Sequence, residues 1–342
     1  MPDLPARPDL RQLRMQAKEL LKAARGGDSD AVARIEAVSD RLMLASAQLA
    51  LARSYGFPSW PRLKAEVERR ELLNRRDLKG LRALFEEHPE LAVEKLEHWS
   101  DHRRGATPLG YVAMLRFDAP RLGLEPVRDG TEAIARMLVA AGASVEGEPD
   151  DRETPLITAA SYGDADVARV LIEAGAEIDV LAAGDAGGVP GGSALLHAAV
   201  FGNTEVVDVL AAAGAQVRSL VEAAAVGNID RRLTPASPLA ERVRALTMAA
   251  AHDRVEAIEE LLGAGTPVDA LDGFGRRALQ AAAESGRPGS VSVLLGAGAD
   301  PQQRDPNEKL TPLEWAQRRV NDHGSTPGHE EVQRLLSAGA AQ

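Results

Sequence analysis

The sequence predicts an all-α protein, a solenoid of stacked helix–turn–helix units with finger-like loops and a helical segment at the N-terminus. Three observations lead to this prediction. The chain has 342 residues, which is long enough for an extended array of repeats. A short Ala-Gly motif recurs through its C-terminal part, each time after a helical pattern. Aromatic residues make up 3% of the chain, which favours helices that pack closely through small aliphatic side chains.

Composition and charge exclude several classes of function. The chain contains no cysteine, which removes disulfides, thiol nucleophiles and cysteine metal sites. Its formal net charge of −11 argues against general binding to nucleic acid or to anionic membranes, but stays compatible with a basic partner. No apolar run is long enough for a membrane span or a signal peptide, so we expect a cytoplasmic protein. Residues 1–104 carry 20 basic and 17 acidic side chains, whereas the remainder carries 20 and 34.

The repeat is marked by the tripeptide Ala-Gly-Ala or Ala-Gly-Thr. Before each copy, apolar residues stand at the i, i+3, i+4 spacing of an amphipathic helix. Two of the intervals between the glycines are 33 residues, and the others are 39, 41 and 51. The glycines are Gly142, Gly175, Gly214, Gly265, Gly298 and Gly339.

A second motif lies about twenty residues before several of these glycines and is clearest at residues 154–163. Thr154 can cap a helix, and Pro155 suits its first turn, where the missing N–H is not needed. The small pair Ala159 and Ala160 allows a neighbouring helix to approach, and Gly163 can end the helix. The two motifs together predict a unit of helix, turn, helix and loop.

These combined motifs resemble the ankyrin-repeat family over roughly residues 105–341. The resemblance implies six full units and one curtailed unit, which falls at residues 220–227 within the longest interval. One family feature is missing: the histidine that usually follows Thr-Pro-Leu. Its hydrogen bonds must therefore be absent or made differently. The residues in its place are Gly110, Ile157, Leu196, Gln280 and Glu314.

We predict three regions: an N-terminal helical extension at 1–64, a capping helix pair with a linker at 65–104, and the array at 105–342. Helices are expected over residues 10–24, 30–55 and 65–92. The first region resembles helical segments that accompany bacterial ankyrin proteins. Tyr55, Phe57 and Trp60 are interpreted as a packed cluster, with a partner-binding patch as the alternative.

The resemblance also implies a concave groove, lined by the residues that follow the alanine pair of each unit. These residues change along the chain from apolar to charged, and Tyr162 and Phe201 are the expected anchors for a partner. In the alternative interpretation, the insertions at 116–130 and 182–193 fold over the apolar residues and make them core. The candidate groove residues are Met114, Leu115, Tyr162, Val200, Phe201, Val226, His252, Glu284, Arg318 and Arg319.

Two classes of function are compatible with this groove. The favoured one is a non-catalytic module that binds a peptide or protein segment with basic groups and apolar anchors. The alternative is an enzyme or small-molecule binder for a largely apolar substrate, with His252 as general acid or base beside Glu284 and Tyr162.

Cofactor and metal sites are not expected. The glycine-rich stretch at 182–193 lacks the Gly-Lys-Ser/Thr sequence of a phosphate-binding loop and is interpreted as a flexible loop. His98 and His102 stand four residues apart, as metal ligands on a helix would, but are interpreted as part of a solvated linker.

Overall fold

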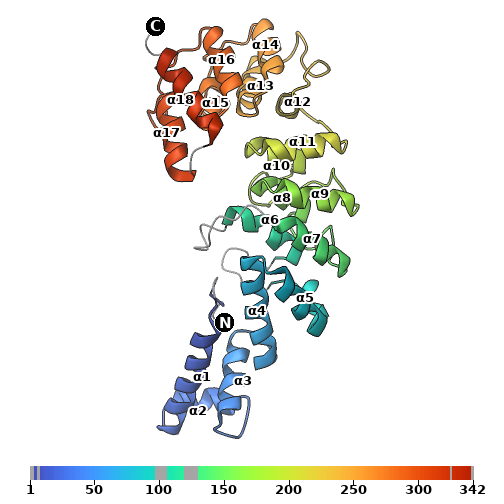
Figure 1. Cartoon of the computed structure of the whole chain (residues 1–342), viewed down its shortest axis with the longest axis vertical. Helices are drawn as coiled ribbons and strands as arrows, with labels where there is room; N and C mark the ends of the chain where they lie inside the picture. Colours follow the sequence, from blue (N-terminus) through green and yellow to red (C-terminus); the bar gives the residue numbers. More distant parts are fainter. Residues whose placement is uncertain (1–3, 6–7, 97–105, 119–129, 324–325, 340–342) are drawn as a thin grey trace. The chain divides into compact units, whose positions relative to one another are not determined.

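The computed structural model describes residues 4–5, 8–96, 106–118, 130–323 and 326–339. All regular structure in these residues is helical, apart from two isolated antiparallel bridges, Leu96–Ala106 and Leu181–Ser193 (Figure 1). The predicted all-α class is therefore confirmed. No helix within the described ranges combines the length and the apolar character needed to span a membrane. The chain divides into two compact units, residues 1–159 with 169–176, and residues 160–168 with 177–342.

Unit 1 begins with three helices that pack against one another, followed by a fourth that packs on the third. The helix expected over 30–55 is in fact two helices, because a turn interrupts it at residues 37–43. In this turn the Ser39 hydroxyl accepts a hydrogen bond from the Arg41 N–H at 3.2 Å and another from the Ser46 hydroxyl at 3.0 Å. The four helices are α1 (Leu10–Arg25), α2 (Ser29–Glu36), α3 (Leu44–Ser54) and α4 (Trp60–Arg75).

The aromatic residues between α3 and α4 form a packed cluster, as expected. Phe57 is buried in a core to which α1 contributes Leu13 and α4 contributes Leu63. Tyr55 and Trp60 are partly buried against the same core. The three rings therefore fix α1, α3 and α4 together.

The remainder of unit 1 contains shorter helices. The capping pair expected over 65–92 corresponds to α4, α5 and η1, although α4 begins five residues earlier, at Trp60. The boundary expected at 104/105 and the histidines at 98 and 102 lie outside the described residues, so the division into three regions stays a prediction. The division into two units falls within two further helices, α8 and α9. The helices are α5 (Leu78–Glu87), η1 (Pro89–Ala92), α6 (Pro108–Asp118), α7 (Thr131–Ala140), α8 (Pro155–Tyr162) and α9 (Ala165–Glu173).

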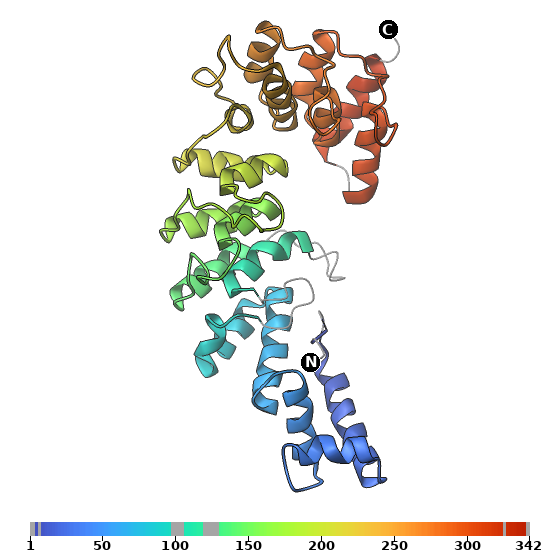
Figure 2. The same cartoon turned by 180° about the vertical axis from the view of Figure 1, so that it is seen from behind.

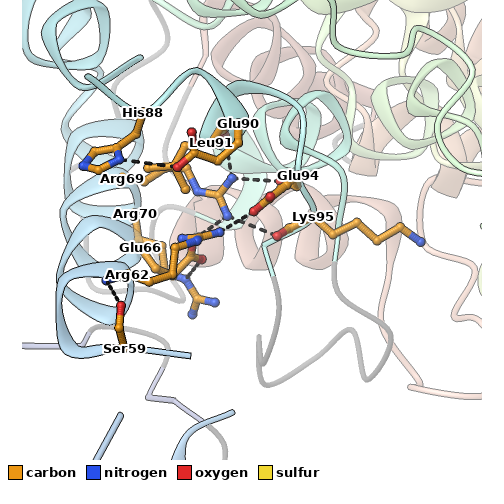
Figure 3. Close-up of polar contacts among 10 residues, drawn as sticks. All are labelled: Ser59, Arg62, Glu66, Arg69, Arg70, His88, Glu90, Leu91, Glu94 and Lys95. Atoms are coloured by element: carbon orange, nitrogen blue, oxygen red, sulfur yellow. Dashed lines mark hydrogen bonds and ion pairs between the residues drawn. The ribbon is translucent and has the colours of Figure 1, made fainter. Parts of the chain in front are cut away.

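A buried ion cluster on α4 fixes the segment that follows η1 (Figure 3). The Glu66 carboxylate accepts hydrogen bonds from Arg70 Nε, at 2.9 Å, and from Arg69 Nη2. Arg69 Nη1 also donates to the carbonyl oxygens of Leu91 and Glu94, at 2.6 and 2.8 Å. Burial lowers the pKa of Arg69, and the charge of Glu66 opposes this shift. One carboxylate thus holds two buried guanidinium groups in place.

Unit 2 contains two rows of helices (Figures 1 and 2). In the first row, α10, α12, α13, α15 and α17 each pack on the next, and α11, α14, α16 and α18 form the second row. α12 has no second-row helix before α13 begins, so the predicted curtailed unit contributes a single helix. The bounds are α10 (Ala194–Val200), α11 (Thr204–Ala212), α12 (Leu220–Val226), α13 (Leu239–Ala251), α14 (Val255–Gly263), α15 (Ala278–Glu284), α16 (Pro288–Gly296), α17 (Pro312–His323) and α18 (Pro327–Gly339).

In the ankyrin family, histidine usually follows Thr-Pro-Leu. In at least two repeats of this chain, the residue at that position caps its helix. The Gln280 side-chain oxygen accepts a hydrogen bond from the N–H of Arg277, at 3.0 Å. Glu314 accepts one from the N–H of Thr311, at 2.7 Å. Each side chain thereby satisfies a backbone donor at the start of its own helix.

For the ion cluster on α4, we expect Glu66→Gln to lower the free energy of unfolding by about 3–5 kcal/mol, because it leaves buried guanidinium charges without their counter-ion. Glu71→Gln on the same helix is the matched control, since Glu71 pairs with Arg75 at the surface. That change should have little effect. Urea unfolding of both variants measures the difference. An equal effect of the two substitutions would contradict the role assigned to Glu66.

Candidate functional site

The candidate residues of unit 2 lie mainly at the C-terminal ends of the first-row helices. Val200, Val226 and Glu284 are the last residues of α10, α12 and α15, and Phe201 directly follows α10. Phe201 is 46% exposed, which is unusual for a phenylalanine side chain. The partly buried residues are Tyr162, Val200, Val226 and Glu284, and the exposed ones are Phe201, Arg318 and Arg319.

The expectation of exposure is wrong for three residues. Met114 and Leu115 are buried in unit 1, where most of α6 is enclosed, including the large side chain of Tyr111. His252 is buried in unit 2. In this conformation these three side chains cannot contact a partner. Most of the insertion expected at 116–130 lies outside the described residues, because 119–129 are not described. The prediction that it covers Met114 therefore stays untested.

Phe201 is held in place by the end of its own helix and by the glycine-rich loop. The His197 ring lies one turn earlier on α10, with its centroid 6.3 Å from that of Phe201. On the loop, a Cβ atom added at Gly188 would lie 3.3 Å from Phe201 Cζ. The loop thus packs against α10, as the alternative interpretation supposed, but it leaves Phe201 half exposed. The result is an aromatic ring that packs on the loop and beside His197 and stays half exposed.

His197 fixes the glycine-rich loop to α10. Its Nδ1 is 2.9 Å from the carbonyl oxygen of Ser193, to which it donates, and its Nε2 accepts from the N–H of Val189 at 3.3 Å. Burial lowers the pKa of His197, which favours the neutral ring that these bonds require. The loop also closes on itself, since the Ala182 N–H donates to the Gly192 carbonyl at 2.9 Å. The loop is therefore structured rather than freely flexible.

Gly188 allows this close approach. Its φ of +68° is a conformation that glycine adopts without strain, and any side chain at this position would press on the Phe201 ring. A Cβ atom added at the neighbouring Gly187 would meet nothing within 4 Å, so that position has no such constraint. Gly188 thus allows the loop to pack on Phe201.

His252 connects the repeat of α13 and α14 to the repeat of α10 and α11 instead of facing a groove. Its Nε2 donates to the carbonyl oxygen of Ala199 at 2.9 Å, and its Nδ1 lies 2.8 Å from the Thr204 hydroxyl. The same hydroxyl accepts a hydrogen bond from Arg287 Nη2 at 2.7 Å, so the Thr204 proton can be donated to His252. Burial, followed by the charges of Arg287 and Arg254, lowers the pKa of His252 to about 4.

This arrangement does not suit His252 to proton transfer. Both ring nitrogens are already bonded within the protein, and the ring is 1% exposed. A general acid or base must reach its substrate directly or through one water molecule. The geometry therefore gives no support to the catalytic set of His252, Glu284 and Tyr162.

A second exposed aromatic side chain was not anticipated from the sequence. Phe274 is 62% exposed in the loop between α14 and α15, and the Arg244 guanidinium lies 5.1 Å from its ring centroid. Asp272 shapes this loop by accepting hydrogen bonds from the N–H groups of Phe274 and Arg276, both at 2.9 Å. The signal was present in the sequence Asp-Gly-Phe-Gly-Arg, a tight turn with an aromatic residue at its tip.

The positively charged candidate residues are Arg318 and Arg319 on α17, and one of them makes local contacts. Arg318 on α17 pairs with Glu308 at 3.2 Å, and its guanidinium lies 5.2 Å from the ring centroid of Trp315. Arg319 is exposed beside it. These side chains therefore present positive charge at the surface of an acidic region.

The comparison with protein-family models agrees with the repeat architecture. A family model described as ankyrin repeats (3 copies) matches residues 126–221, 211–305 and 246–341, which together span more than half of the chain. Among solved structures, the chain is similar to the ankyrin repeat domain of human ASB11, with 21% sequence identity, 68% of this chain and 97% of that chain covered, and a TM-score of 0.32. The comparison with curated proteins gives no match.

The shifted pKa of His252 predicts a pH dependence of stability. The folded-state pKa of about 4 lies below the ordinary value of 6.5, so the unfolded state takes up the proton first as the pH falls. This contribution is fully present above pH 6.5 and is lost as the pH falls toward 4, by about 3 kcal/mol in total. Chemical denaturation of wild type and His252→Gln measures it. The stability gap between the two proteins should narrow on acidification, and a constant gap would contradict the prediction.

Proposed function

The chain belongs to the ankyrin-repeat family, whose repeats generally serve as protein–protein interaction modules, and we propose that it binds a peptide or protein segment through unit 2. The binding surface in this proposal lies at the C-terminal ends of the first-row helices. The further candidate contacts of this surface are Tyr162, Val200, Val226, Glu284 and Arg319. Phe201 is its apolar anchor.

The half-exposed ring of Phe201, packed on the glycine-rich loop, is the observation that carries this proposal. A side chain that is already ordered before binding loses little conformational entropy when a partner packs on it. The His197 and Gly188 contacts supply this order. Large aromatic side chains in such positions commonly contribute most to the binding energy of an interface. Burial of the exposed part of Phe201 by an apolar side chain of the partner would use both properties.

Charge supports a partner with basic groups. Residues 105–342 carry 34 acidic and 20 basic side chains, and the excess of negative charge attracts positively charged segments over distances of about 10 Å at moderate ionic strength. The charge would act mainly on the rate of association, and the apolar anchor mainly on the lifetime of the complex.

We expect Phe201→Ala to weaken binding of the partner about 10-fold or more, because it removes the anchor without disturbing buried structure. Crosslinking of the full chain in a host lysate, followed by titration of the captured protein, measures the effect. Leu239→Ala is the matched control, since Leu239 is 50% exposed but is the first residue of α13, whereas the proposed surface lies at the C-terminal ends of the helices.

The control should bind like the wild type. If Phe201→Ala and Leu239→Ala retain the same protein with the same affinity, Phe201 is not an anchor. A Phe274→Ala variant then tests the second exposed ring: a loss of binding in this variant alone would move the surface to the loop between α14 and α15.

A further inference from the structure

Unit 1 contains a basic pocket that the proposed interaction surface does not use. A cavity of about 850 Å³ lies beside α1 and α4. Four arginines line it: Arg11 and Arg14 from α1, and Arg70 and Arg75 from α4. We propose that this pocket binds a small molecule that carries two or more phosphate groups.

The pocket contains a guanidinium group that is fixed before any ligand arrives. Arg70 is 1% exposed, and its Nε donates to the buried carboxylate of Glu66 at 2.9 Å. On the same helix, Asn74 lies one turn further along the pocket wall. Its Oδ1 accepts the hydroxyl proton of Tyr111 at 2.5 Å, which leaves the amide N–H groups to donate. A rigid wall of donors lowers the entropic cost of binding an anion.

The α1 side of the pocket supplies positive charge that no ion pair among the described residues neutralises. Arg11 and Arg14 are exposed and, within the described ranges, form no ion pair. The two carboxylates that line the pocket are already engaged. Asp9 caps α1 by accepting from the N–H groups of Arg11 and Gln12, and Glu71 pairs with Arg75 at 2.7 Å.

Phosphate suits this pocket better than a single carboxylate. Arg70 pairs with Glu66 and Arg75 pairs with Glu71. Among the described residues this leaves the two charges of Arg11 and Arg14 without an ion pair, so a ligand with at least two negative charges balances them. The exposed guanidinium groups of Arg11 and Arg14 can each donate two parallel hydrogen bonds to a phosphate group. The cavity also has the size that holds a small organic ligand, in the range of about 300–1,000 Å³. Leu10 and Pro8 add an apolar edge on which a non-phosphate part of the ligand could rest.

Calorimetric titration of the full chain with pyrophosphate and with adenosine triphosphate, at low salt, tests the proposal. We expect one ligand per chain. The double variant Arg11→Glu/Arg14→Glu should bind about 10-fold more weakly or worse, because it reverses the charge of one wall. Both positions are exposed, and equal melting temperatures will show that the variant folds.

The matched control is Arg34→Glu/Arg82→Glu, which makes the same change in net charge at exposed arginines of α2 and α5. This control should bind like the wild type. Arg11→Lys/Arg14→Lys should fall between the two, because lysine keeps the charge but cannot donate in the bidentate geometry.

Three results would overturn the proposal. The first is no binding of either phosphate compound by the wild type at millimolar concentration. The second is equal weakening in the control variant, which would indicate a general effect of net charge. The third is equally tight binding of citrate, which would show that the pocket accepts carboxylates without preference for phosphate.

Discussion

The structure of unit 2 depends on the close stacking of short helices that cannot bury their apolar faces alone. Alanine pairs make this stacking possible. Ala198 and Ala199 on α10, and Ala249 and Ala250 on α13, are almost fully buried in the first row. A larger side chain at any of these positions would push the neighbouring helix away. The shortage of aromatic residues in the sequence follows from the same requirement.

Stacking also decides which residues at the helix ends remain available for function. The last carbonyl groups of a helix have no hydrogen-bond partner within that helix. In unit 2, side chains of the following repeats donate hydrogen bonds to them. Asn203 Nδ2 donates to the carbonyl of Ala160 at 2.7 Å, Arg287 Nε to that of Ala251 at 3.0 Å, and His252 to that of Ala199. His252 is occupied in this way, whereas Phe201 is not. Equivalent positions in different repeats thus have different roles.

The sequence predicted the fold well because the repeat motifs are local: a cap, an alanine pair and a glycine each act within a few residues. The curtailed unit at α12 and the packed aromatic cluster around Phe57 were predicted for the same reason. Exposure could not be predicted equally well. It depends on contacts between residues far apart in sequence, such as the 53-residue separation of His252 and Ala199. The buried positions of Met114 and Leu115 were missed for this reason. The exposed Phe274, in contrast, had a local signal in the tight turn at residues 272–276 that was overlooked.

Amide hydrogen exchange of the chain, with and without its captured protein partner, tests the central claim most directly. The account predicts slower exchange on binding at the C-terminal end of α10, at residues 196–204, and in the glycine-rich loop at 182–193, because a partner packed on Phe201 would shield both. Slower exchange confined to residues 10–75, with unit 2 unchanged, would contradict the claim that the partner binds at the ends of the first-row helices.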